Sequence, residues 1–350
     1  MSFLDESKKI KSIDRENLAD LIAEFPNQCL KAYQQAQKII LPQNFSQIKR
    51  IVIAGMGAPI LAGEIAFSII EDQIKIPVDF SRNWQLPKNI DKNSLVILVS
   101  FSGQTKETLS CFNEALKKET KIFIISGGGD LEKLAKKNCL PIFTFSHPGP
   151  SRAALGFLLM PILIVLEKLG FVDLKRLKIE KSLQLLNDFS QKFGPGVETE
   201  KNIAKYLAYF IFDHCPLILA PKNFLPVARR WKNEFNENAK NFALFEELPE
   251  VFHNTIEGSL PWRLKDEFVV LILESPKQNR NYQKTLYYFK DLLNKEDIRF
   301  ESIPCLNGNT FVDVLSLIII GDWTSFYLAI LNNQDPTPVK KIDWLKSQTL

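Results

Sequence analysis

Residues 95–109 read Leu-Val-Ile-Leu-Val-Ser-Phe-Ser-Gly-Gln-Thr-Lys-Glu-Thr-Leu and change character abruptly in the middle. Residues 95–99 form a short, unbroken apolar run, as expected for a parallel strand that is buried on both faces. Apolar side chains recur at helical spacing in residues 106–117. The stretch therefore predicts a strand, a turn rich in hydroxyl groups and then a helix.

The predicted turn has the chemistry of an anion site. A strand that turns directly into a helix aims free backbone N–H groups, and the positive end of the helix dipole, at one point. Ser100, Ser102 and Thr105 add hydroxyl groups there, and Gly103 adds flexibility. A phosphate suits such a site, but an ordinary serine- and threonine-rich helix cap has the same residues. This turn alone leaves both interpretations open.

Length and composition favour a globular protein of more than one domain. A chain of 350 residues is too long for one ordinary core, so we expect two domains. Hydrophobic residues make up 45% and charged residues 24%, a typical soluble balance. The net charge of +4 is mild and no basic stripe is present, so we expect no nucleic-acid partner.

The cysteines and apolar segments indicate the cytoplasm. Five scattered cysteines show neither a disulfide framework nor metal-ligand spacing, which fits a reducing compartment without a metal site. Residues 1–9 lack the apolar core of a signal peptide. Residues 155–166, the most apolar segment, are too short to span a bilayer, so we expect no membrane association.

Strands and helices alternate along the chain, which predicts doubly wound parallel sheets. In the first half the expected strands are residues 50–54, 78–81, 95–99, 121–125 and 141–144, and a long helix, residues 152–169, closes the unit. In the second half they are residues 216–220, 268–274 and 298–303, with helices at 223–241, 283–293 and 311–331. The junction falls in an amphipathic helical segment, residues 173–192. We therefore expect domains 1–172 and 173–350.

Four further residues are candidates for chemistry. Glu237 stands between two asparagines that could hold its carboxylate, and His253 is one of three histidines. Arg152 begins a helix after a Pro-Gly-Pro segment, and Lys346 lies in a terminal helix. Each taken alone is equally well explained as a solvated, packed or capping side chain.

Taken in order, the motifs resemble the bifunctional phosphoglucose/phosphomannose isomerases. The matching segments are Gly55-Met56-Gly57, residues 100–109, Ser126-Gly127-Gly128, Arg152 to Gly156, Asn236 to Lys240, His253-Asn254, Gly321-Asp322-Trp323 and Asp335 to Val339. Any one of them is weak, but they run in family order from about residue 50 to the C-terminus. The turn at residues 100–105 also looks like the phosphosugar signature of SIS (sugar isomerase) domains.

The resemblance implies two three-layer SIS domains with terminal helices, and interconversion of glucose or mannose 6-phosphate with fructose 6-phosphate. Ser100, Ser102 and Thr105, with Gly57, would bind the phosphate. Glu237 would move a proton between C1 and C2, and Arg152 would steady the cis-enediolate. His253 and Lys346 would serve ring opening or substrate binding. In related isomerases the histidine comes from the neighbouring subunit, which implies a homodimer.

Those residue types suit the reaction, which needs no metal or other cofactor. Removing a proton next to a carbonyl needs a positioned carboxylate, and the enediolate oxygen needs fixed positive charge. A non-catalytic SIS-domain sensor, or an isomerase of another phosphosugar, is the alternative. The presence of Arg152, Glu237, His253 and Lys346 together favours an enzyme, because a sensor needs no base.

One departure concerns the first glycine-rich turn. The family usually has Gly-Met-Gly-Gly-Ser, whereas this chain has Ala58 and Pro59 in the last two positions. A serine hydroxyl and a backbone N–H are thereby lost. Each lost hydrogen bond to a phosphate would weaken binding by about 1.5–3 kcal/mol. This departure favours the sensor and leaves the proposed acid–base residues untouched.

Overall fold

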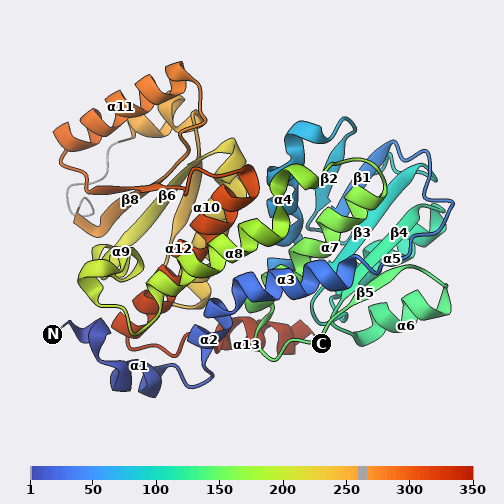
Figure 1. Ribbon diagram of the computed structural model, residues 1–350, viewed down its shortest axis with the longest axis horizontal. Helices are drawn as coiled ribbons and strands as arrows, with labels where there is room; N and C mark the ends of the chain where they lie inside the picture. Colours follow the sequence, from blue (N-terminus) through green and yellow to red (C-terminus); the bar gives the residue numbers. More distant parts are fainter. Residues whose placement is uncertain (1, 259–265, 350) are drawn as a thin grey trace. The chain divides into compact units, whose positions relative to one another are not determined.

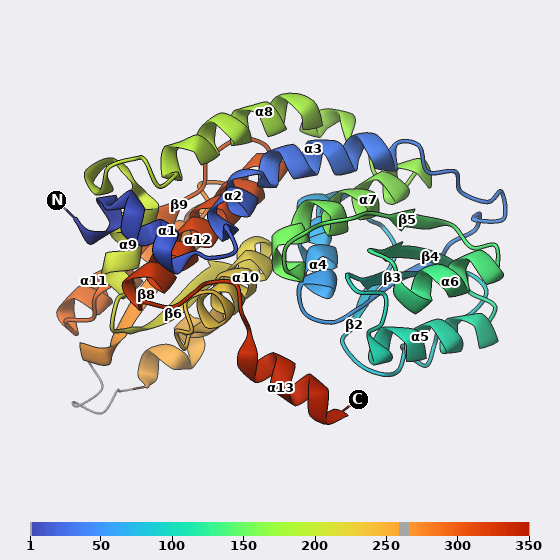
Figure 2. The same cartoon turned by 90° about the horizontal axis from the view of Figure 1, so that it is seen from below.

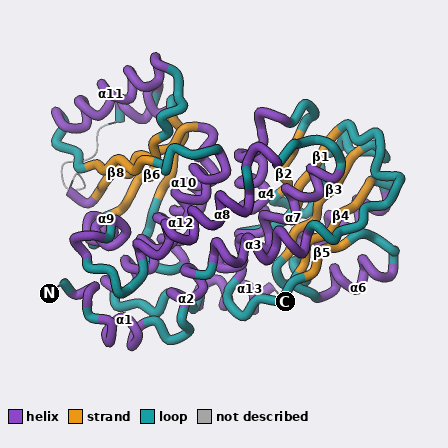
Figure 3. Tube along the Cα trace, in the orientation of Figure 1, coloured by secondary structure: helices purple, strands orange, loops and turns teal. Residues whose placement is uncertain are grey.

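The computed structural model describes residues 2–258 and 266–349. The chain divides into two compact units, Glu24–Gln184 and Met1–Ala23 together with Leu185–Leu350. We call these the N-terminal unit and the C-terminal unit. Each is built on one parallel β-sheet with helices packed against it (Figure 1; Figure 3). The expected fold class of two doubly wound parallel sheets is confirmed.

The N-terminal unit holds a five-stranded sheet in the order β2-β1-β3-β4-β5, and every neighbouring pair is parallel. Its strands are β1 (Arg50–Ala54), β2 (Val78–Ser81), β3 (Ser94–Ser100), β4 (Lys121–Ser126) and β5 (Ile142–Thr144). Its helices are α3 (Phe25–Ala36), α4 (Ala58–Ile70), η2 (Glu71–Gln73), α5 (Lys106–Lys117), α6 (Gly129–Lys137), η3 (Ser151–Ala154), α7 (Leu155–Lys168) and η4 (Lys175–Leu177).

Helices cover both faces of this sheet. In Figure 2, α3 and α7 lie above the strands, and α5 and α6 lie below them. Every residue of β3 is buried, as its unbroken apolar run predicts. On the α5–α6 side, Phe112 and Leu131 pack with Val96 and Ile122 of the central strands. Burial from both sides explains why an alternating polar pattern is absent from β3.

The C-terminal unit holds a four-stranded parallel sheet in the order β7-β6-β8-β9. Its strands are β6 (Cys215–Pro221), β7 (Leu244–Leu248), β8 (Phe268–Glu274) and β9 (Phe300–Pro304). Its longer helices are α1 (Ser7–Ile13), α2 (Leu18–Ala23), α9 (Ile203–Ile211), α10 (Leu225–Glu237), α11 (Arg280–Lys295), α12 (Thr310–Leu331) and α13 (Lys340–Thr349). Short helices are η1 (Phe3–Asp5), η5 (Gln191–Phe193), η6 (Thr199–Lys201), η7 (Lys222–Phe224), η8 (Glu250–His253) and η9 (Thr255–Glu257). A further helix, α8 (Ile179–Ser190), contains the division between the units.

The 22-residue helix α12 is the core helix of the C-terminal unit. By length and composition it is the one helix of the described residues that could cross a membrane, but 94% of its apolar window is buried inside the protein. It packs against α9, α10 and α2. Burial on all sides explains why its sequence is apolar nearly throughout rather than on one stripe.

The first residues of the chain pack with the C-terminal unit. Lys205 on α9 is fully buried, and its Nζ donates to Asp5 Oδ1 at 3.0 Å and to the carbonyl oxygen atoms of Pro195 (3.1 Å) and Val197 (2.7 Å). Leu18 of α2 is also buried. The expected division at residues 172 and 173 therefore differs from the observed one. Residues 1–23 join the second unit, and the boundary lies within α8.

Candidate functional site

The turn after β3 is held together by its own hydroxyl groups. Ser100 ends β3 and is fully buried, and its Oγ lies 2.9 Å from Oγ1 of Thr105, the residue before α5. The N–H of Gly103 donates to Ser100 Oγ at 3.1 Å, and that of Gln104 donates to Ser102 Oγ at 3.2 Å. Thr105 makes no side-chain hydrogen bond to the first turn of α5. The expected strand–turn–helix is confirmed.

A second turn, after β4, packs directly against this one. Gly127 N–H donates to the carbonyl of Phe101 at 3.1 Å, and Leu131 N–H donates to the carbonyl of Gly103 at 3.1 Å. Gly103 has φ of +66°, and a Cβ added there would lie 1.8 Å from the carbonyl oxygen of Gly128. Only glycine therefore allows the two turns to approach this closely.

The turn after β3 lies where the strand order of the sheet reverses, between β1 and β3. The chain passes from β1 outward to β2 and then returns to β3 on the other side of β1. Gly55, at the end of β1, approaches β3 so closely that a Cβ would lie 2.6 Å from the Val99 carbonyl oxygen. Gly57 follows with φ of +61° and precedes α4. Ligands of doubly wound folds bind in the crevice at such a reversal. Gly57, Ser100, Ser102 and Thr105 share this edge of the sheet.

Arg152 belongs to the same unit and lies on η3. Its side chain is buried, with 5% exposed. A buried glutamine on α3 holds the backbone around it: Gln28 Nε2 donates to the Ala153 carbonyl at 2.8 Å, and Gln28 Oε1 accepts from Gly156 N–H at 2.7 Å. Sequence analysis missed Gln28, although a polar residue among buried neighbours on α3 was a usable signal.

In the C-terminal unit, Glu237 lies at the amino ends of the sheet strands, and His253 lies at their carboxyl ends. Helix α10 runs back from the carboxyl end of β6, so Glu237, its last residue, lies at the amino edge. The contact from Asn241 Nδ2 to the carbonyl of His214, just before β6, confirms this direction. His253 ends η8, which follows the carboxyl end of β7. One sheet edge therefore cannot hold both side chains.

Lys346 lies on α13, whose residues 340–348 are all exposed. Lys240, the last residue of the Asn236 to Lys240 motif, lies just after α10. Its Nζ donates to the carbonyls of Glu237 (2.9 Å), Asn238 (3.2 Å) and Asp335 (2.8 Å). It thereby ties the end of α10 to the segment before α13.

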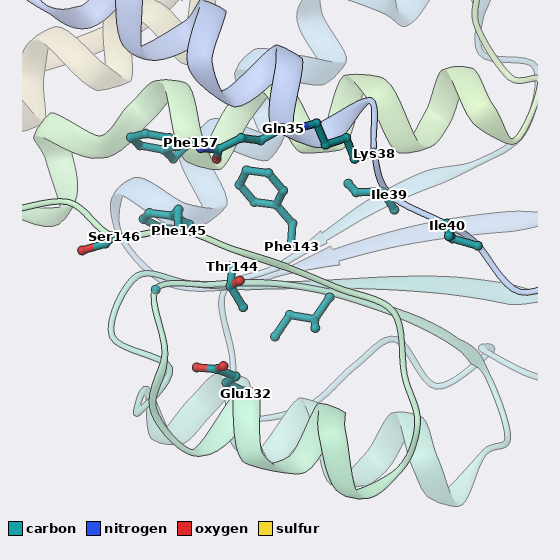
Figure 4. Close-up of a pocket in the computed structure, with 12 residues that line it drawn as sticks. Gln35, Lys38, Ile39, Ile40, Glu132, Phe143, Thr144, Phe145, Ser146 and Phe157 are labelled. Carbon is teal, nitrogen blue, oxygen red and sulfur yellow. The ribbon is translucent and has the colours of Figure 1, made fainter.

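A groove of about 850 Å³ in the N-terminal unit lies beside the edge strand β5, not over the turn after β3. Figure 4 shows Phe143 and Phe145 between Gln35 and Lys38 on one side and Glu132 on the other. None of the sequence-predicted site residues lines it. Within residues 2–258 and 266–349, no group of three or more His, Cys, Asp or Glu side chains could hold a metal ion.

Comparisons with known proteins agree with this architecture. Residues 44–148 match the family model described as the SIS domain, and residues 200–348 match the bacterial phospho-glucose isomerase C-terminal SIS domain. The C-terminal domain of glucosamine-fructose-6-phosphate aminotransferase from Francisella tularensis shares the fold, with a TM-score of 0.69, 16% identity and coverage of 92% of this chain and 97% of that one.

Sequence relatives extend over nearly the whole chain. The bifunctional phosphoglucose/phosphomannose isomerase of Caldicellulosiruptor bescii is 33% identical over 329 residues, covering 93% of this chain and 97% of its own. The bifunctional phosphoglucose/phosphomannose isomerase of Aquifex aeolicus is 30% identical over 321 residues, covering 90% and 95%. This chain belongs to the family of bifunctional phosphoglucose/phosphomannose isomerases.

Proposed function

We propose that the protein is an aldose–ketose isomerase that interconverts glucose 6-phosphate and mannose 6-phosphate with fructose 6-phosphate. Family membership supports the reaction class. The observation that carries the proposal is the turn after β3, which lies at the reversal of strand order and interlocks with the turn after β4. Such an arrangement suits a small anionic ligand, and a hexose 6-phosphate supplies the anion.

The substrate phosphate binds the turn after β3 in this proposal. Ser102 and Thr105 offer hydroxyl donors, Ser100 Oγ lies 2.9 Å from Thr105 Oγ1, and Gly57, with φ of +61°, directly precedes α4 in the neighbouring turn. Helix α5 begins directly after Thr105, so its positive dipole end points at the same place. These features fix the non-reacting end of the sugar and orient the carbons that react.

Glu237 moves the proton between C1 and C2, and Arg152 stabilises the enediolate oxygen. Each role needs a charge of fixed position in a site that excludes water. His253 and Lys346 serve ring opening and substrate binding. Because Glu237 and His253 lie at opposite edges of one sheet, we infer that His253 acts in the site of a second subunit. The active form is then a homodimer.

We place this protein in the cytoplasm, with hexose 6-phosphate as its small-molecule partner. The five cysteines, all among the described residues, form no disulfide bonds, and three of them, Cys29, Cys111 and Cys305, are buried. Burial raises the pKa of the Cys111 thiol to about 11, which keeps it protonated and unreactive at neutral pH. Buried free thiols suit a reducing compartment.

The reaction is tested by assaying the purified protein with glucose 6-phosphate and with mannose 6-phosphate, coupling fructose 6-phosphate formation to a second enzyme. We expect both aldoses to react, and we expect turnover to be the same after dialysis against EDTA, because the proposed chemistry uses only side chains. Loss of activity in EDTA that zinc restores would overturn the mechanism. Binding of either sugar phosphate without turnover would favour a sensor instead.

The Ala58-Pro59 turn gives a second expected result. Pro59 lies buried in the first turn of α4 and has no N–H to offer a phosphate. Replacing Ala58 by Gly and Pro59 by Ser together is expected to lower KM for the hexose phosphate roughly tenfold, with kcat little changed. This is the signature of binding that is equal in the ground and transition states.

Steady-state kinetics of the two forms decide the matter. Ser102→Ala serves as the opposite change and is expected to raise KM more than it lowers kcat. Equal KM values for the natural and restored turns would show that this turn does not contact phosphate. A rise of kcat from nearly zero in the restored form would mean that the natural protein only binds the sugar phosphate. The proposed enzymatic function would then be wrong.

A further inference from the structure

A cluster of charged and polar side chains is buried between α10 and α12, directly beside the end of α10 that carries Glu237. Each member of the cluster is 5% exposed or less. Its members are Arg230, Glu234 and Asn238 from the α10 side and Asp322 and Ser325 from α12. We call it the Arg230 cluster. Burial of so much polarity in an otherwise apolar core is expensive unless every charge is paired.

The cluster is closely hydrogen-bonded. Arg230 forms a two-point contact with Asp322, in which Nε lies 2.8 Å from Oδ1 and Nη2 lies 2.8 Å from Oδ2. Nη1 of Arg230 lies 3.1 Å from Oε1 of Glu234. Asn238 Nδ2 donates to Oε2 of Glu234 at 3.0 Å and to Oγ of Ser325 at 2.9 Å. Five side chains on two helices thus form one network.

The backbone is shaped to bring the two helices together at this level. Trp231, next to Arg230, donates from its indole nitrogen to the carbonyl of Leu317 at 2.8 Å. A Cβ on Gly321, next to Asp322, would lie 2.1 Å from that nitrogen. The glycine therefore lets α10 approach α12 closely enough for Arg230 to reach Asp322.

Helix geometry connects the cluster to Glu237. Arg230, Glu234 and Glu237 are spaced by four and then three residues, which places them along one face of α10. Asn238, a member of the cluster, directly follows Glu237 and caps the helix, and its backbone N–H donates to the carbonyl of Glu234 at 2.8 Å. Burial lowers the pKa of the Arg230 guanidinium, but the charges of Asp322 and Glu234 raise it above its usual value, and the charge of Glu237 adds to this rise.

We propose that the Arg230 cluster is the positioning device for Glu237: through its two carboxylates and one guanidinium it fixes the end of α10 and sets the basicity of the Glu237 carboxylate. The inference rests on the proposed role of Glu237 as the base. The cluster touches no reacting atom itself, so its members are positioning residues.

The net charge of the cluster determines whether it strengthens or weakens Glu237 as a base. With both carboxylates ionised, the cluster carries two negative charges against one positive charge. A net negative charge beside Glu237 makes its carboxylate a stronger base. Burial raises the pKa of Asp322 to about 6, against the opposing effect of Arg230.

Helix α10 itself also carries Arg229 and Lys232, and further charges come from the elements around it. Elements packed against α10 contribute Asp313 and Asp322 from α12, Glu246 and Glu247 from β7 and Lys222 from η7, while β6 contributes none, and Lys240 follows the helix. Asp313 lies nine residues before Asp322, or about 13 Å along α12. Of the acidic residues on α12, only Asp322 is bonded to α10.

The test is the pH profile of kcat for glucose 6-phosphate isomerisation by the full-length protein. Asp322→Asn removes one negative charge with little change of shape. We expect the acidic limb of the profile to move down by about one pH unit, and kcat at pH 8 to fall roughly three- to tenfold with KM nearly unchanged. Glu234→Gln removes the same charge from α10 and is expected to shift the limb in the same direction.

Asp313→Asn is the matched control. Asp313 is buried on the same helix and paired with Lys277, so its loss weakens the fold without altering the cluster. We expect its acidic limb to coincide with that of the natural protein. If Asp322→Asn does not fold, the pH profile of Glu234→Gln tests the proposal instead.

The outcomes distinguish an error in the role of the Arg230 cluster from an error in the role of Glu237. Suppose that Glu237→Gln is inactive, but that Asp322→Asn and Glu234→Gln have the same acidic limb in the pH profile of kcat as the natural protein. The cluster is then only structural, and this inference is wrong. A displaced limb in Asp313→Asn equal to that of Asp322→Asn would also overturn it. If Glu237→Gln keeps its activity, the base has been misassigned, and the proposed function is at fault instead.

Discussion

Glu237→Gln is expected to lower kcat for both glucose 6-phosphate and mannose 6-phosphate by about 10²–10⁴-fold, because an amide cannot carry a proton between C1 and C2. The substitution keeps the shape of the side chain at the last position of α10. The phosphate turn lies on a different sheet, so binding of the sugar phosphate should persist. Steady-state kinetics and calorimetric titration with fructose 6-phosphate measure the two effects separately.

Glu296→Gln is a suitable control for this experiment. Glu296 is an exposed glutamate that follows the last turn of α11 in the same unit, much as Glu237 ends α10. Its replacement is expected to leave kcat within twofold of the natural value, roughly the limit for a surface change. Retention of more than a few per cent of turnover by Glu237→Gln would remove that residue from the role of base.

The strands of both sheets were predictable because burial on two faces leaves a strong local signal. Residues 95–99 and 268–274 are apolar runs bounded by polar residues, and they became β3 and β8. Hydrogen bonds between neighbours in sequence are also local, and those of Asp14 with the first residues of α2 are an example. Asp14 accepts from the N–H groups of Leu18 at 2.8 Å and Ala19 at 3.1 Å.

Elements whose stability comes from tertiary contacts were missed. Strand β7, Leu-Phe-Glu-Glu-Leu, is an edge strand with only Leu248 buried, so its sequence lacks the apolar run of a central strand. Helix α9 was not assigned, although Asn202 caps it by accepting from Ala204 N–H at 3.1 Å and Lys205 N–H at 3.2 Å. The docking of residues 1–23 depends on Asp5 and Lys205, which are 200 residues apart.

In the candidate site, too, local features were predictable, and features that depend on tertiary contacts were not. The phosphate turn is a local strand–turn–helix, and its residues could be chosen from sequence alone. The support for Arg152 comes from Gln28, 125 residues away from Ala153, and no local pattern indicates that contact. The separation of Glu237 from His253 follows from the direction of α10 relative to β6, which only topology reveals.

Gly103→Ala is the second substitution with a large expected effect, and it tests whether the two turns must interlock. At φ of +66° an alanine is strained, and its Cβ would lie 1.8 Å from the Gly128 carbonyl oxygen, so the turns after β3 and β4 must separate. The strain and the overlap together are expected to lower the free energy of unfolding by about 2–5 kcal/mol.

We expect Gly103→Ala to bind the sugar phosphate more weakly as well as to be less stable. Separation of the turns pulls Gly103 N–H from Ser100 Oγ and moves Ser100 away from Thr105, so the hydroxyl groups proposed to bind phosphate lose their arrangement. We expect KM for either aldose phosphate to rise roughly tenfold or more. Urea unfolding and steady-state kinetics at a temperature where the variant remains folded measure both quantities.

Gly170→Ala separates strain from overlap. Gly170 follows α7 in the same unit with φ of +76°, but nothing lies within 4 Å of its added Cβ. It is expected to lose only the conformational part, about 1–2 kcal/mol, with KM unchanged. Because the two glycines share a backbone conformation and differ in their neighbours, any excess loss at Gly103 measures the contact between the turns. Equal losses of stability and equal KM values would show that this contact contributes nothing to the site, and the phosphate would then have to bind elsewhere.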